Sequence, residues 1–169
     1  MSIRPRAGKP YEFKGMSEGS LTGFPMVCLV NGGSASGSEI VSAALQDHKR
    51  AYVIGERSYG KGSVQNIMEF DGGDLKMTTA TFWRPSNKNL NKSSTTGKEE
   101  DEWGVTPDKV VKLTSKERAD LQEHLRDTEI IQPKGRTPSK EKAEFKDKQL
   151  DAALEYLRGQ IKVVDKGDK

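Results

Sequence analysis

The amino-acid sequence predicts an α/β fold, and three neighbouring segments carry this prediction. Residues 26–30 form a short, continuous apolar run, which is typical of a strand buried on both faces of a parallel sheet. Residues 36–48 then place apolar side chains at helical spacing, and residues 51–54 form a second apolar run. A strand, a helix and a strand in this order favour two parallel strands joined by a crossover helix.

A β-hairpin is expected after this unit. Two strand-like runs, residues 63–70 and 75–83, flank the turn sequence Asp71-Gly-Gly-Asp74. Residues 85–103 are polar and include a run of acidic side chains, so we expect a surface loop there. Residues 105–113 then have the composition of a segment that returns to the sheet.

The segment before this body has a different character. Residues 1–20 are rich in Gly, Lys, Arg and Ser, and we expect them to form an exposed, poorly ordered leader. They lack the apolar core that would indicate a signal peptide. Residues 21–113 are expected to form the folded body.

Two helices and a linker are expected after the sheet. Thr114 and Glu117 match the pattern of a capping box, which predicts a helix within residues 114–131. Residues 132–147 contain proline and glycine and indicate a linker. Residues 148–169 place apolar side chains at helical spacing and predict an amphipathic helix with a tail.

Composition and charge exclude several classes of protein. The chain has 169 residues, and its single cysteine excludes an intramolecular disulfide framework and a thiolate-rich zinc site. No apolar run approaches the ~20 residues that span a bilayer. The net charge of +3 comes entirely from residues 132–169, and no aromatic and basic platform accompanies it. We therefore expect no nucleic-acid partner, and we expect neither a metal nor a cofactor.

The first candidate for chemistry is the stretch Asn31-Gly-Gly-Ser-Ala-Ser-Gly-Ser-Glu39, between the first strand and the helix. A serine at such a turn can act as a nucleophile, because nearby helix N–H groups can stabilise an oxyanion. Serine is also a common helix N-cap, and the local pattern alone favours that structural role. A histidine base is not expected, because His48 lies ~18 Å from Ser36 along the same helix and His124 lies in a charged helix.

The second candidate is the stretch Gly55-Glu-Arg-Ser-Tyr-Gly-Lys-Gly-Ser-Val-Gln65. It begins like a phosphate-binding loop, so nucleotide binding through Gly55–Lys61 is one interpretation. However, Gly62 stands where such a loop has the Ser or Thr that meets Mg²⁺, and a strand is expected to follow. Lys61 is instead a candidate general base, since burial in an apolar pocket disfavours an ammonium, although most loop lysines are exposed. Gln65 can accept a hydrogen bond from it.

Three segments together resemble a known family, the C-terminal processing peptidases or tail-specific proteases. They are residues 20–47, Gly55–Gln65 and Gly104–Asp108, which agree with the family in order and spacing over roughly residues 20–112. The resemblance implies a crotonase-like fold, a sheet with flanking helices. It also implies a serine-type endopeptidase that cleaves protein substrates near their C-termini.

The resemblance assigns a role to four residues, all named by their numbers in this chain. It implies a Ser-Lys dyad, with Ser36 as the nucleophile and Lys61 as the general base. It implies that Gln65 orients the lysine and that the backbone N–H of Gly37 is one oxyanion donor. The family usually has alanine at the position of Gly37, a change that leaves the backbone donor in place.

The resemblance also leads to expectations about partners and location. Family members carry an upstream PDZ domain and further catalytic-domain strands, so these residues are expected to be the C-terminal part of the catalytic domain. A protein or peptide substrate is expected to bind as an added strand, and unpaired sheet edges are expected to favour self-association. The implied location is the periplasm or cell envelope. The alternative is a truncated, inactive fragment that acts as a binding or assembly module.

Overall fold

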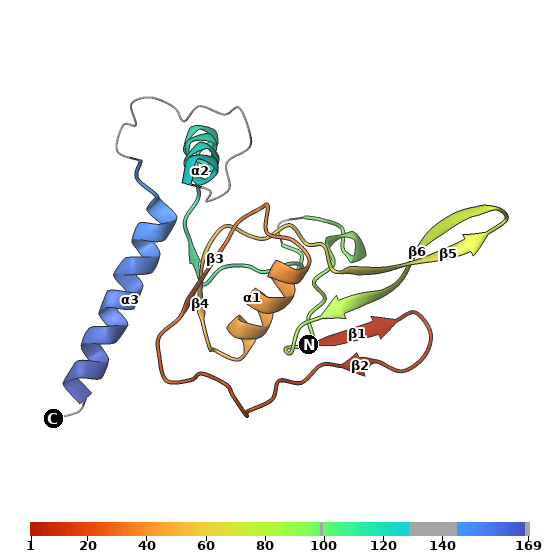
Figure 1. Ribbon diagram of the computed structural model, residues 1–169, viewed down its shortest axis with the longest axis horizontal. Coiled ribbons are helices and arrows are strands. Elements are labelled where there is room, and N and C mark those ends of the chain that lie inside the picture. The colour runs from red at the N-terminus through yellow and green to blue at the C-terminus, as the bar shows by residue number, and fades with distance from the viewer. Residues whose placement is uncertain (99, 129–144, 168–169) are drawn as a thin grey trace.

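The computed structural model describes residues 1–98, 100–128 and 145–167, and within these ranges it shows a mixed α/β chain (Figure 1). The predicted fold class is therefore confirmed. In chain order the elements are β1 (Ser2–Pro5), β2 (Tyr11–Glu12), β3 (Val27–Val30), α1 (Gly37–Asp47), β4 (Tyr52–Gly55), β5 (Ser63–Phe70), β6 (Gly73–Trp83), the 3₁₀ helix η1 (Lys92–Ser94), β7 (Lys109–Val110), α2 (Ser115–Thr128) and α3 (Lys148–Gly167).

The parallel unit predicted at the start of the body is present. β3 pairs with β4 in parallel, α1 connects them, and β7 adds to the other edge of β4, also in parallel. Gly55 ends β4 with φ +131, and a Cβ placed there would lie 2.0 Å from the carbonyl oxygen of Val30. A side chain at this position would therefore push the two central strands apart.

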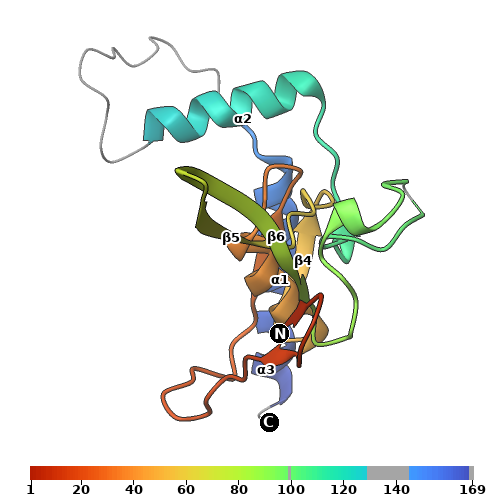
Figure 2. The same cartoon turned by 90° about the vertical axis from the view of Figure 1, so that its right-hand side faces the viewer.

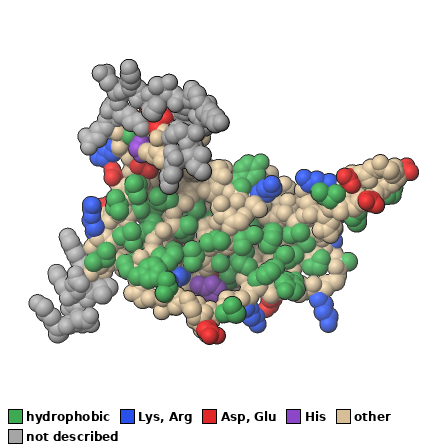
Figure 3. Space-filling view, in the orientation of Figure 1, with side chains coloured by type: hydrophobic (Ala, Val, Ile, Leu, Met, Phe, Trp, Pro, Cys, Tyr) green, Lys and Arg blue, Asp and Glu red, His purple; other side chains and the backbone are tan. Residues whose placement is uncertain are grey.

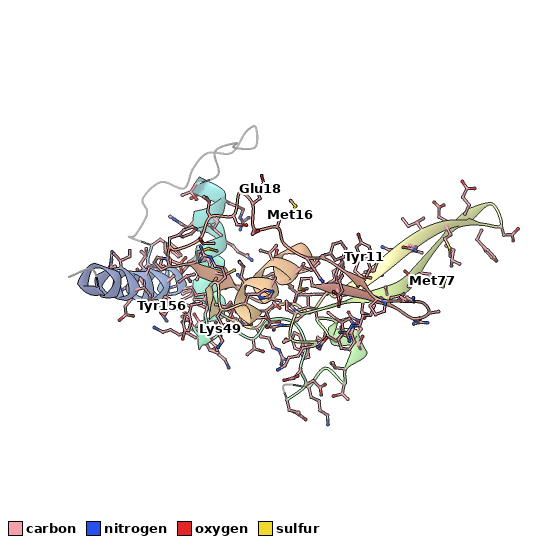
Figure 4. All side chains as sticks on the ribbon, turned by 90° about the horizontal axis from the view of Figure 1, so that it is seen from below. Tyr11, Met16, Glu18, Lys49, Met77 and Tyr156 are labelled. Carbon is pink, nitrogen blue, oxygen red and sulfur yellow. The ribbon has the colours of Figure 1, made fainter. Side chains whose placement is uncertain are left out.

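The predicted hairpin forms the edge of a second, antiparallel sheet with the strand order β2-β1-β6-β5. Its two-residue turn consists of Asp71 and Gly72, both at positive φ (+47 and +77), as a type I′ turn requires. The register shifts between Val64 and Gln65, and β5 and β6 then stay paired as far as Phe70 and Gly73. The far end of the hairpin projects from the body (Figure 1), and Met77 on it lies at the opposite end of the molecule from Tyr156 on α3 (Figure 4).

The expected leader, residues 1–20, contains two strands, so this prediction is wrong for its first part. β1 pairs with β6 over four residues, from Ser2 opposite Trp83 to Pro5 opposite Ala80, and β2 then pairs with β1. Strands form here because of a contact between segments that are distant in the sequence. The second edge of β6 presents unpaired backbone groups, and β1 satisfies them although its own composition is polar.

The expected surface loop also differs from the prediction, because its first part enters the core. Leu90 is fully buried, and its backbone is bonded on both sides: its N–H donates to the Phe82 carbonyl and its carbonyl accepts from Gly104. The buried cluster combines side chains from β3, α1, β4, this segment and the segment that follows it: Val30, Ala43, Val53, Leu90 and Val105. Other apolar side chains stay at the surface and spread across the face seen in Figure 3.

The two C-terminal helices begin as expected. The Thr114 N–H donates to the Glu117 carboxylate at 2.8 Å and the Glu117 N–H to the Thr114 hydroxyl at 3.2 Å, which completes the predicted capping box of α2. The Lys148 ammonium and Thr114 together lower the pKa of Glu117 to about 2. α2 lies across one end of the molecule (Figure 2). Most of the expected linker, residues 132–147, lies outside the described residues.

α3 packs on the parallel sheet through aromatic side chains. Tyr156 stacks on Tyr52 with ring centroids 4.3 Å apart, which places the helix against β3 and β4. In the part of the chain that the structure describes, no helix is both long and apolar enough to cross a membrane.

An ion pair ties the end of α1 to the end of β6. The guanidinium of Arg84 donates to Asp47 at 2.5 Å and to the Gln46 side chain at 2.7 Å, and both charged side chains are only 10% exposed. Burial opposes ionisation of Asp47, but the hydrogen bonds from Arg84 and Ser86 dominate and hold its pKa below the usual range. This carboxylate therefore stabilises the folded chain at neutral pH.

We predict that Asp47→Asn lowers the free energy of unfolding by about 2 kcal/mol at pH 7, because it leaves the Arg84 guanidinium without its carboxylate. Since the pKa of Asp47 is depressed on folding, its contribution is present above ~4 and is lost as the pH falls further. Urea unfolding of both proteins should show the difference shrinking below pH ~4. Asp74→Asn, an exposed change on the hairpin, is the matched control, and an equal effect from it would contradict the prediction.

Candidate active site

Ser36 lies at the junction of the loop after β3 and the first turn of α1. It is exposed and adopts φ +57 and ψ −114, a conformation that residues other than glycine rarely take. Such backbone strain is common where a side chain must be presented at a functional site. The turn therefore presents the Ser36 hydroxyl at the surface, at the N-terminal end of a helix.

The loop before Ser36 is held by its own polar groups. The Asn31 side chain accepts a hydrogen bond from the Gly33 N–H at 2.8 Å, and the Ser34 hydroxyl accepts one from the Asn31 N–H at 3.1 Å. The Ser34 carbonyl accepts a hydrogen bond from the Tyr59 N–H at 2.9 Å. The bond between Ser34 and Tyr59 joins the serine loop to the loop after β4, and several further hydrogen bonds join the same two loops.

Gly37 is the first residue of α1, so its N–H has no acceptor within the helix. The residue is exposed, and it lies directly after Ser36. An N–H in this position, at the positive end of a helix, can donate to an oxyanion formed next to Ser36.

The two candidate loops meet at one buried carboxylate, that of Glu39 on α1. The residue is fully buried and accepts four hydrogen bonds. Its Oε2 accepts from the Ser36 N–H at 3.0 Å and from the Lys61 N–H at 2.8 Å. Its Oε1 accepts from the Ser58 hydroxyl at 2.5 Å and from the Gly60 N–H at 2.6 Å. A single oxygen atom therefore holds the backbones of Ser36 and Lys61 side by side.

From the sequence, Glu39 was only the last residue of the stretch that carries the candidate serine, so the structure adds this role. The signal that could have revealed it is its spacing, three residues after Ser36, where a carboxylate can reach back to the N-cap N–H. The hydrogen bonds of Glu39 with the loop after β4 could not have been predicted from such local spacing. They join residues that are distant in the sequence.

Lys61 lies in the loop between β4 and β5, as the sequence predicts, but its side chain is exposed. Of the two alternatives for Lys61, burial in an apolar pocket and exposure on a loop, the structure shows exposure. The reason is that the nearby contacts are made by the backbone of the loop, which turns inward to Glu39 and leaves the lysine side chain on the outer side.

The glycines on either side of Lys61 permit a close approach that a side chain would prevent. A Cβ on Gly60 would lie 2.7 Å from the Trp103 ring, and one on Gly62 would lie 2.6 Å from the Asn91 nitrogen. The indole of Trp103 is itself fixed by cations, since the Arg57 guanidinium lies 3.9 Å and the Lys92 ammonium 4.4 Å from its ring centroid. The polar segment after β6 therefore supports the Lys61 loop.

Gln65 does not join the other candidates in the structure. It lies on the outer strand β5, is exposed, and lines a cleft beside the hairpin. Among the hydrogen bonds of the described residues, none links its side chain to Lys61. The extended backbone that begins at Ser63 explains this, because the rise of ~3.3 Å per residue carries Gln65 away from the loop.

The remaining candidates have structural roles. His48 is exposed at the C-cap of α1. His124 is half-buried on α2 and stacks on Phe145, with ring centroids 4.5 Å apart. Cys28 packs against the core, and burial raises the pKa of its thiol. A strand rather than a helix follows Gly62, so the nucleotide-binding interpretation is not supported. In the described ranges no group of three His, Cys, Asp or Glu side chains could hold a metal ion.

Comparison with known proteins gives consistent matches. Residues 2–111 match peptidase family S41. The carboxy-terminal-processing protease of Bartonella bacilliformis is 37% identical over 149 residues, which are 81% of this chain and 32% of that protein. The carboxyl-terminal-processing protease of Synechocystis is 32% identical over 162 residues, 95% of this chain and 30% of that protein. The chain thus spans about a third of the length of these two curated relatives.

Solved structures also resemble the chain. A photosystem II D1 C-terminal processing protease is 38% identical over 52% of this chain and 20% of its own, with a TM-score of 0.45.

We predict that Glu39→Gln lowers the free energy of unfolding by about 3 kcal/mol or more. An amide keeps one acceptor oxygen but places an NH₂ group against N–H donors, which leaves buried donors unpaired. Chemical denaturation should show this loss. Glu123→Gln, an exposed change on α2, is the control, and similar unfolding curves for the two variants would mean that the Glu39 carboxylate does not hold the two loops together.

We predict that Gly62→Ala lowers the thermal unfolding midpoint by several degrees, roughly the effect of 1–2 kcal/mol in a domain of this size. The φ angle of Gly62 is not positive, so the change tests only the close approach of this loop to Leu90 and Asn91. Gly32→Ala adds the same methyl group where no atom lies within 4 Å. Calorimetry should separate the two variants, and the prediction fails if their midpoints agree.

Proposed function

Since this chain belongs to peptidase family S41, we propose that it carries the nucleophile and the general base of a serine endopeptidase that cleaves protein substrates near their C-termini. The observation that carries the proposal is the shared Glu39 oxygen, which bonds to the backbone N–H groups of both Ser36 and Lys61. A nucleophile and its base must lie within hydrogen-bond reach in the reacting complex, and this arrangement brings their backbones together.

In the proposed reaction, the Ser36 hydroxyl oxygen attacks the carbonyl carbon of the peptide bond while the Lys61 amine takes its proton. The Gly37 N–H donates to the oxyanion of the tetrahedral intermediate. The C–N bond then breaks, and the Lys61 ammonium gives its proton to the leaving amine, which leaves an ester on Ser36. Water attacks this ester with Lys61 again as the base, so that an acid is released and the hydroxyl is restored.

A bound substrate would also change the surroundings of Lys61. The lysine must be a neutral amine to accept a proton, and it is exposed in the structure. A peptide lying over the loop would exclude water and disfavour the ammonium. Gln65 then has the proposed role of a hydrogen-bond partner that orients Lys61 once both are covered.

We propose that the substrate binds as an added strand. Two edges in the described sheets lead toward the site: β3, which precedes the serine loop, and β5, which begins two residues after Lys61. Both present unpaired backbone groups, which an extended peptide can satisfy. Self-association remains a proposal as well, supported by exposed apolar side chains on the hairpin such as Phe70, which is 68% exposed.

The relatives give an indication of the cellular location of this chain. They include bacterial proteins and a chloroplastic carboxyl-terminal-processing peptidase of Arabidopsis thaliana, 43% identical over 88 residues, 52% of this chain and 15% of that protein. We infer an extracytoplasmic location from these relatives, with the periplasm or cell envelope as the more specific proposal.

A fluorophosphonate probe tests the nucleophile directly. We predict that the chain is labelled and that Ser36→Ala is not, because the probe reacts with a serine hydroxyl activated by a base. Ser38→Ala, which removes a hydroxyl two residues later on the same helix turn, should keep its labelling. Equal labelling of the chain and Ser36→Ala would remove Ser36 as the nucleophile.

The same probe tests the base. Lys61→Ala should slow labelling by on the order of 10²–10⁴, while Lys9→Ala, an exposed lysine in the turn after β1, should label at the rate of the unchanged chain. An unaffected rate in Lys61→Ala would contradict the proposed dyad.

A further inference from the structure

A cleft of about 600 Å³ lies between β1, the base of the β5–β6 hairpin and the turn at η1. Ser63 and Gln65 of β5 form part of its wall, and Arg4 and Arg6 contribute from the first strand and the residue after it. We call it the arginine cleft. Its wall on β5 begins at Ser63, two residues after Lys61.

The arginine cleft carries uncompensated positive charge. No acidic side chain is among the residues that line it. Among the ion pairs of the described residues, none involves Arg4 or Arg6. A second, larger cleft of about 830 Å³ differs in this respect, because side chains of both signs line it, including the paired Asp47 and Arg84.

Neutral groups hold Arg4 in place without cancelling its charge. Its guanidinium donates to the side-chain oxygen of Asn87 and lies 4.2 Å from the ring centroid of Trp83. The backbone of Arg6 is bonded to the carbonyl of Thr79 at 3.1 Å, while its side chain is exposed. The cleft thus has one fixed guanidinium and one that can move to meet a ligand.

Two hydroxyl groups of the cleft also have a proton to donate. The Thr81 hydroxyl accepts a hydrogen bond from the Trp83 indole at 2.9 Å, and the Ser94 hydroxyl accepts one from the Asn91 amide at 2.9 Å. Among the described residues, no acceptor takes the proton of either hydroxyl. A hydroxyl that already accepts from one side is well placed to donate to the other, and together with the guanidiniums these groups suit an anion with several acceptor atoms.

We propose that the arginine cleft binds a carboxylate of the peptide substrate and so contributes to the choice of cleavage site. The inference rests on the proposed function only in that the ligand is a peptide. A planar carboxylate matches the paired N–H groups of a guanidinium. It can come from the C-terminus of the peptide or from an acidic side chain, and the experiment separates these two sources.

Calorimetric titration at low salt compares three acetylated pentapeptides of alanine and valine. The first has a free C-terminal carboxylate, the second a C-terminal amide, and the third an amide with one glutamate. Binding is measured in the Ser36→Ala chain, so that no peptide is cleaved. We expect the second peptide to bind about tenfold more weakly than the better of the other two, the effect of one charge-assisted contact. The tighter of the first and third identifies the source of the carboxylate.

Arg6→Gln, added to the Ser36→Ala chain, should reduce the preference for the better carboxylate peptide over the amide peptide to within about twofold. Lys116→Gln removes the same charge from exposed α2 and should leave the preference intact, which controls for long-range attraction. The inference is overturned if the three peptides bind equally, if none of them binds, or if Arg6→Gln keeps the preference. Each of these results leaves the labelling test of Ser36 unchanged, so failure of the two proposals can be distinguished.

Discussion

The carboxylate of Glu39 is the constraint on which the rest of the site depends. A buried charge without partners is costly, and here four donors from the serine turn and the loop after β4 satisfy it. The same bonds determine where Ser36 and Lys61 lie. The Ser58 hydroxyl extends the network, since it accepts the Val105 N–H at 2.7 Å and so includes the segment that returns to the sheet. Stability and the placement of Ser36 and Lys61 are thus properties of one buried network.

A second constraint is the close approach of backbones around Lys61. Glycine at positions 60 and 62 lets the loop lie against Trp103 and against the backbone at Leu90 and Asn91. The segment after β6 is polar in composition, yet it contributes Leu90 to the core and a cation-flanked indole to the loop. It acts as the support on which the lysine loop rests. The Arg57 guanidinium, which lies over the Trp103 ring, also donates to the Trp103 carbonyl at 3.2 Å and so keeps this polar segment close to the body.

The two clefts differ in the pairing of the charged side chains that line them. Where α1 meets the end of β6, opposite charges are paired and nearly buried, which suits a structural joint. In the arginine cleft, the Arg4 guanidinium contacts neutral side chains, and no acidic side chain lines the cleft. A chain with 28 basic and 25 acidic residues has enough carboxylates to pair most cations. The absence of a carboxylate from the lining of this cleft is the basis of the proposed recognition of a peptide carboxylate.

Local patterns in the sequence were sufficient for much of this protein. The apolar runs, the turn at Asp71 and Gly72, and the capping box at Thr114 depend on neighbours a few residues apart, and the structure confirms them. The choice of Lys61, between two glycines, as a candidate general base also used only a local pattern. The tertiary structure alone decided the burial of Glu39, the exposure of Lys61, the pairing of β1 with β6 and the entry of Leu90 into the core. These features depend on contacts between distant parts of the chain, and neither periodicity nor composition carries information about which distant groups will meet.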